Sequence, residues 1–104
     1  MFSIGFVMKL KPGCAEEYKR RHDELWPELD ELMKRNSVNM VIYRHGELLF
    51  GFSTCPSKAE WDNCGKDPLT PKWDKYMAEV MEADEQGNLY FEELPASFMY
   101  GQFK

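Results

Sequence analysis

Apolar side chains alternate with other residues along the first ten positions of the chain. A spacing of two is typical of a β-strand that buries one face, and the Pro12-Gly13 pair ends the alternation. We therefore predict an N-terminal strand over residues 2–10, whose buried face is formed by Phe2, Ile4, Phe6, Met8 and Leu10.

Over residues 14–35 the spacing of apolar positions changes to three and four. This spacing predicts an amphipathic helix, whose stripe consists of Tyr18, His22, Leu25, Leu29 and Leu32. Pro27 interrupts the helix, because proline lacks the helical N–H and crowds the preceding turn. We expect a kink or break near residues 23–27 and a second helical piece that ends at about Arg35.

Two further apolar runs are separated by a short turn. Residues 38–44 and 48–54 have strand composition, and His45-Gly46-Glu47 lies between them, so we predict a β-hairpin. Near the end of the chain, residues 82–93 are acidic and predict a loop. Residues 95–103 return to strand composition and predict a last strand.

Capping patterns predict two helices between the hairpin and the last strand. Ser57-Lys-Ala-Glu60 has the pattern of a capping box, which opens a short helix to about Cys64. Thr70 is followed by proline at the first helical position, and this pair opens a helix to about Met81.

The order of predicted elements is strand, helix, strand, strand, helix, helix, strand. This order indicates a single domain over residues 1–104 with a ferredoxin-like α+β sandwich of the dimeric α+β barrel type, in which helices cover one face of an antiparallel sheet. The other face needs cover as well. We therefore expect a homodimer, with Phe98 and Tyr100 of the last strand as candidate contacts.

Charge and cysteine content narrow the classes of partner. Thirteen basic against eighteen acidic residues give a net charge of −5, which argues against a nucleic-acid or anionic-membrane partner. No apolar run is long enough to span a membrane. The three cysteines have neither disulfide nor zinc spacing, so we expect free thiols in the reducing cytoplasm and no metal.

The two histidines are the side chains that titrate near neutral pH. His45 lies in the predicted hairpin turn, where a solvated role suffices. His22 lies one helical turn after Tyr18 and one turn before Trp26. It is either a half-buried structural histidine or an acid–base catalyst beside groups that suit a sugar, since rings stack on C–H faces and polar tips bind hydroxyls.

A second aromatic group opens the helix that begins near residue 70. Trp73 lies in its first turn, where it belongs either to the core or to a pocket rim, while Trp61 and Tyr76 fit the core. The carboxylate of Asp74 either complements the positive helix N-terminus or accepts hydrogen bonds from a ligand hydroxyl.

Three segments resemble the L-rhamnose mutarotase family: Glu16-Glu-Tyr-Lys-Arg-Arg-His22, Trp26-Pro-Glu-Leu29 and Lys72-Trp-Asp-Lys-Tyr-Met77. The resemblance runs nearly end to end. It implies a small dimeric ferredoxin-like isomerase without cofactor, which interconverts the α and β anomers of a 6-deoxyhexose such as L-rhamnose. It also implies that His22 is the proton donor and that Tyr18 binds the sugar.

Two positions depart from the family pattern. Met40 stands where the family has a substrate-contacting tyrosine, and Asp74 stands where it has the second tryptophan of a pair that begins at Trp73. These exchanges leave the identity of the sugar open. Two alternatives remain at this level, because the fold also hosts other functions: a cofactor-independent monooxygenase-like module and a non-catalytic sugar sensor.

Overall fold

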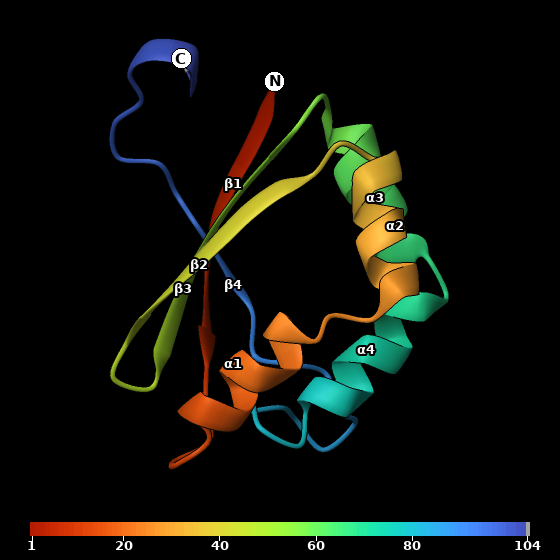
Figure 1. Ribbon diagram of the computed structural model, residues 1–104. Coiled ribbons are helices and arrows are strands. Elements are labelled where there is room, and N and C mark those ends of the chain that lie inside the picture. Colours follow the sequence, from red (N-terminus) through yellow and green to blue (C-terminus); the bar gives the residue numbers. More distant parts are fainter. Residues whose placement is uncertain (104) are drawn as a thin grey trace.

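A four-stranded antiparallel sheet forms one layer of the molecule (Figure 1). The computed structural model describes residues 1–103. Strand β1 (Phe2–Lys9) pairs along its whole length with β3 (Leu48–Cys55), and β3 pairs on its other side with β2 (Asn39–His45). The short strand β4 (Glu92–Leu94) adds to the free edge of β1, which gives the order β2-β3-β1-β4.

Four helices form the second layer, on one side of this sheet (Figure 1). They are α1 (Ala15–Asp23), α2 (Pro27–Arg35), α3 (Lys58–Lys66) and α4 (Leu69–Met77). The predicted ferredoxin-like α+β sandwich, with helices on one face of an antiparallel sheet, is therefore confirmed.

The break in the first helical region falls where Pro27 predicts it. Helix α1 ends at Asp23, and Pro27 is the first residue of α2. Trp26 has an extended backbone, with φ −58° and ψ 132°, because a residue before proline is excluded from the helical region. The break lets α1 and α2 run in different directions over the same sheet face (Figure 1).

The two later helices begin close to their predicted starts but use different caps. Ser57 precedes α3, yet its hydroxyl bonds the Glu60 carboxylate instead of a backbone N–H. Helix α4 begins at Leu69, so the prediction of Thr70 as its cap was wrong. The carboxylate of Asp67 accepts a hydrogen bond from the Leu69 N–H at 2.9 Å, and the Thr70 hydroxyl donates to the Cys64 carbonyl at 2.6 Å.

The predicted last strand over residues 95–103 was wrong. The strand lies earlier, at Glu92–Leu94, inside the segment predicted as loop, and the chain ends in a 3₁₀ turn over Gly101–Phe103. Pro95 follows β4 directly and offers no N–H for a ladder bond, so pairing stops there. Phe98 and Tyr100 are 82% and 79% exposed, and their alternation therefore does not mark a buried face of this protomer.

The core lies between the helices and the facing side of the sheet, and this side of β1 carries Ile4, Phe6 and Met8. Gly51 on β3 is opposite Phe6, and the Phe6 ring occupies the space of a side chain there. A Cβ on Gly51 would lie 2.1 Å from Phe6 Cε2. The glycine is therefore required by close approach, and it lets the large ring enter the core.

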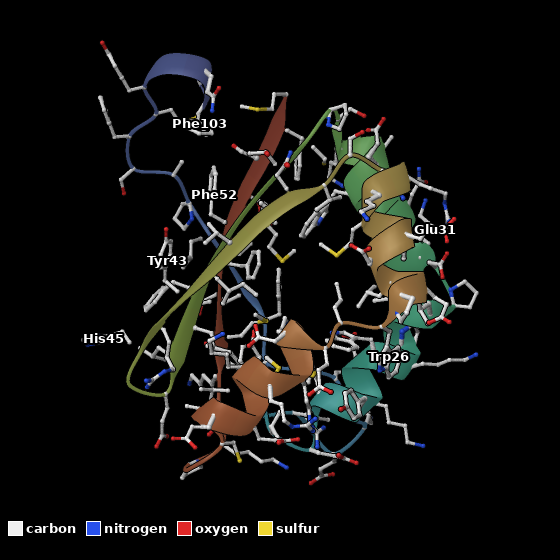
Figure 2. All side chains as sticks on the ribbon, in the orientation of Figure 1. Trp26, Glu31, Tyr43, His45, Phe52 and Phe103 are labelled. Atoms are coloured by element: carbon white, nitrogen blue, oxygen red, sulfur yellow. The ribbon has the colours of Figure 1, made fainter. Side chains whose placement is uncertain are left out.

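The other side of the sheet is open over much of its area, and several apolar side chains on it point away from the helices (Figure 2). The ring of Phe103 packs edge-on against Phe52 with centroids 5.3 Å apart, so the C-terminal turn covers one part of this side. We call the large apolar side chains that stay exposed on this side the open face; they are Val41, Tyr43, Phe50, Phe52 and Leu94. None of the helices described is long and apolar enough to cross a bilayer.

Candidate functional site

A cleft of about 1490 Å³ lies between the helix-facing side of the sheet and the helices. Helix α1 and helix α4 contribute one wall, and β1 and β2 contribute the opposite wall. The loop over residues 85–91 lines one part of it. The lining is mixed, with aromatic and aliphatic surfaces interrupted by a few polar groups, as in sites for small molecules.

Five of the six residues predicted for the site line this cleft: Tyr18, His22, Met40, Trp73 and Asp74. Trp26 is the exception. It lies at the junction of α2 and α4 (Figure 2), where its ring packs edge-on against Trp73, with centroids 5.0 Å apart. The same ring is tilted against that of Tyr76, with centroids 5.4 Å apart. The break at Pro27 turns Trp26 away from the α1 stripe, so it supports Trp73 from behind.

His22 is held between two aromatic rings. Its ring centroid lies 4.4 Å from that of Tyr18 and 5.5 Å from that of Trp73, which it meets edge-on. Burial lowers the pKa of His22, although the Tyr18 carbonyl and Asp23 oppose this shift. The imidazole is therefore mainly neutral at neutral pH.

The hydrogen bond of His22 defines its tautomer. Nδ1 lies 3.4 Å from the Tyr18 carbonyl oxygen, which can only accept, so Nδ1 carries the proton. In the neutral imidazole this leaves the lone pair on Nε2. The ring therefore has a proton acceptor available for a molecule bound in the cleft.

The hydroxyl of Tyr18 is buried without a hydrogen-bond partner among residues 1–103. Burial also raises the pKa of this phenol, so the group is a neutral donor at physiological pH. Unpartnered buried hydroxyls are uncommon because they lose their hydrogen bonds to water. A polar ligand in the cleft would restore the missing bond.

Asp74 and Met40 complete the predicted set. Asp74 follows Trp73 on α4, and burial raises the pKa of its carboxyl. Among the described residues it forms no ion pair, so its oxygens are open to donors from a ligand. Met40 lies on β2 and adds a flexible apolar surface to the opposite wall.

Sequence reasoning missed several polar residues that line the cleft, among them Arg44, Gln86 and Asn88. Arg44 follows Met40 at a spacing of four along β2, so the alternation of that strand carried a signal for it. No sequence signal pointed to the two loop residues, Gln86 and Asn88. Their backbone N–H groups both donate to the Asp84 carboxylate at 2.9 Å, a local turn that only the structure positions beside the cleft.

These groups define a class of site. Among its lining groups are the imidazole of His22, the buried hydroxyl of Tyr18, the carboxylate of Asp74 and the indole of Trp73, which together suit a neutral polyhydroxylated molecule with apolar faces. The protein is thus a ferredoxin-like α+β protein with a cleft of the kind that binds carbohydrates.

Comparison with known proteins gives the family. A profile described as L-rhamnose mutarotase matches residues 3–98. The L-rhamnose mutarotase of Pectobacterium carotovorum is 32% identical over 94% of this chain and 97% of that protein, and that of Listeria monocytogenes is 38% identical over 81% and 84%. A crystal structure of an L-rhamnose mutarotase from Formosa agariphila superimposes with a TM-score of 0.83, at 29% identity, over 97% of this chain and 100% of that one. This chain belongs to the L-rhamnose mutarotase family, whose named members are carbohydrate isomerases.

Proposed function

We propose that this protein is a mutarotase that interconverts the α and β anomers of a 6-deoxyhexose such as L-rhamnose, with His22 as the acid–base group. Family membership supports the reaction class. The observation that carries the assignment of His22 is its position in the cleft, between the rings of Tyr18 and Trp73. The hydroxyl of Tyr18 has no hydrogen-bond partner among residues 1–103.

The reaction opens a cyclic hemiacetal and closes it again on the other face. Neutral His22 takes the proton of the anomeric hydroxyl on Nε2, while a water molecule protonates the ring oxygen as the C1–O5 bond breaks. The imidazolium of His22 then gives its proton back to the hydroxide that this water leaves. Rotation about C1–C2 turns the aldehyde, and the reverse steps re-form the ring. The open-chain sugar returns all protons, so the reaction needs no net acid, base or electron carrier.

The other cleft residues bind and orient the sugar in this proposal. Tyr18 donates its hydroxyl hydrogen, Asp74 accepts hydrogen bonds from sugar hydroxyls, and the Trp73 ring stacks on a C–H face. Met40 packs against the apolar part of the sugar ring, which carries the 6-methyl group. Trp26 acts indirectly, because it packs against Trp73.

Replacement of the imidazole tests this proposal directly. We expect His22→Asn to slow anomer exchange of L-rhamnose, measured by saturation-transfer NMR, by about 100-fold or more, since a positioned acid–base group contributes that much. His45→Asn is the matched control and should keep the wild-type rate, because His45 is the exposed last residue of β2 and does not line the cleft. An unchanged rate in a folded His22→Asn protein contradicts the assignment.

The identity of the sugar needs a separate experiment. We propose a screen of exchange rates over L-rhamnose, L-fucose and common aldoses, combined with thermal shift. Faster exchange of a 6-deoxyhexose than of its 6-hydroxy counterparts supports the proposed substrate class. A thermal shift without exchange identifies a sugar sensor, and no response to any sugar favours a monooxygenase-like module.

We further propose a homodimer that pairs the open faces of two protomers. The support is physical: monomers rarely expose a contiguous apolar patch of this kind, and Tyr43 alone is 69% exposed. Phe98 and Tyr100 stack on each other at 6.4 Å and are exposed in this protomer, so they remain candidate contacts. The three free cysteines are consistent with a cytoplasmic protein.

A further inference from the structure

Arg21 forms a bridge between two helices. Its side chain is only 11% exposed. From α1 it donates through Nη1 to the carbonyl of Tyr76 on α4 at 2.6 Å, and its Nη2 lies 2.9 Å from Oε1 of Glu79, just after that helix. The guanidinium also lies over the Tyr76 ring, 4.1 Å from the centroid.

The bridge has a second anchor on its own helix. Arg21 Nε donates to Glu17 Oε2 at 2.8 Å, so the guanidinium is held on both sides. A planar guanidinium can form these bonds and stack on a ring at once, whereas the lysine ammonium is a point charge that cannot. We call Arg21, Glu17, Tyr76 and Glu79 the α1–α4 clamp.

The clamp stands directly behind the proposed acid–base group. Arg21 precedes His22 on α1, and Tyr76 lies one turn after Trp73 on α4, with its ring 5.6 Å from the Trp73 ring. Neither Arg21 nor Tyr76 lines the cleft. The clamp therefore joins the two helices that bring His22 and Trp73 together, without being available to a bound molecule.

We propose that Arg21 is a positioning residue, which fixes α1 against α4 so that the His22 imidazole keeps its place between Tyr18 and Trp73. The meaning of this role for catalysis rests on the proposed function, but the position of His22 can be measured without it. Loss of the clamp lets α1 shift and admits water to the imidazole.

The neighbouring arginine provides a matched control. Arg20 is also on α1 and also pairs with Glu17, but its side chain is 53% exposed. Within residues 1–103 its ion pairs are confined to Glu17 at 2.6 Å and Glu24 at 2.7 Å, both on α1 or at its end. Arg→Lys at either position keeps the positive charge on the same helix, and only the substitution at Arg21 removes the clamp.

The test compares Arg21→Lys with Arg20→Lys by two readouts. NMR titration of the His22 ring should show its pKa move up toward the ordinary value of about 6.5 in Arg21→Lys and stay low in Arg20→Lys. Both variants keep the positive charge at the substituted position and leave the titratable residues Tyr18, Asp23 and Asp74 unchanged. For anomer exchange, we expect kcat/KM to fall about 10- to 100-fold in Arg21→Lys, because small misplacements of a catalytic group are costly.

Each outcome has a distinct meaning. A wild-type His22 titration and wild-type exchange in Arg21→Lys overturn the positioning role and leave the proposed function intact. A shifted titration in a protein that catalyses no exchange supports the positioning role and contradicts the proposed function. If Arg21→Lys does not fold, Arg21→Gln is compared with Arg20→Gln, a pair in which both variants lose one positive charge on α1 and only the first loses the ion pairs and ring stacking of the clamp.

Discussion

Within the described residues, 1–103, the buried hydroxyl of Tyr18 has no hydrogen-bond partner, so ligand binding and folding stability place opposite demands on this one oxygen atom. An unsatisfied buried hydroxyl lowers the stability of the folded protein. The same hydroxyl is a donor for a sugar in the proposed site. The ring of Tyr18 is part of the core, so its apolar contacts do not depend on the oxygen.

We predict that Tyr18→Phe separates these two contributions. The unliganded protein should keep its stability or gain about 1 kcal/mol, because the unpaired oxygen is removed and the ring remains. Sugar affinity should fall roughly 2- to 10-fold through the lost hydrogen bond. Thermal unfolding and calorimetric titration measure the two effects, and Tyr43→Phe on the open face is the control. Lower stability with unchanged affinity would contradict the role of Tyr18.

At the level of elements, the packing of β1 against β3 depends on a glycine, Gly51, which has no side chain. Phe6 reaches the core through the space over Gly51, and it packs there near Trp61, with ring centroids 6.3 Å apart. A strand glycine is unfavourable by itself, because it loses more backbone freedom on folding than other residues. Its presence here is explained by the ring opposite.

We therefore predict that Gly51→Ala destabilises the protein by about 1–3 kcal/mol, since overpacking forces Phe6 or the strand to move. Urea unfolding measures this as a lower midpoint at constant slope. Gly65→Ala on α3 is the matched control, because a Cβ there meets nothing within 4 Å. That variant should gain about 0.5–1 kcal/mol from its lower backbone entropy. Equal midpoints for the two variants would refute the close-approach argument.

The whole molecule has one covered and one open sheet face. Helices bury the first, while the second exposes Tyr43 (Figure 2). Phe50, the partner of Tyr43 on the adjacent strand, is exposed as well. For a 104-residue chain, burying this second face in a dimer would add substantially to a small core.

We predict that Tyr43→Glu converts the proposed dimer to a monomer, because the charge would be buried unpaired between two open faces. Sedimentation velocity measures the change as a drop from twice the chain mass to the chain mass. Lys34→Glu, on the outer layer at α2, is the control and should sediment as the wild type does. A wild-type protein that sediments as a monomer would refute the pairing of open faces.

Much of the fold follows from local pattern. The period-two alternation of β1 and the proline break before α2 are properties of neighbouring residues, and both appear where they were predicted. Strand β4 was missed because Glu92 and Glu93 have little β propensity. The free edge of β1 recruits them, and no local signal reports that edge. Thr70 was misplaced as a cap for a similar reason, since its hydroxyl bonds the end of α3 instead.

The sequence by itself determined the order of elements from β1 to α4, the face of β1 that is buried and the resemblance that identifies the family. These depend on spacing within a few residues. Only the tertiary structure decided which side chains share the cleft, that Trp26 stands behind Trp73, and that Arg21 ties α1 to α4. The physical reason is distance along the chain: Arg21 and Tyr76 are 55 positions apart, and their contact exists only after both helices pack on the same sheet face.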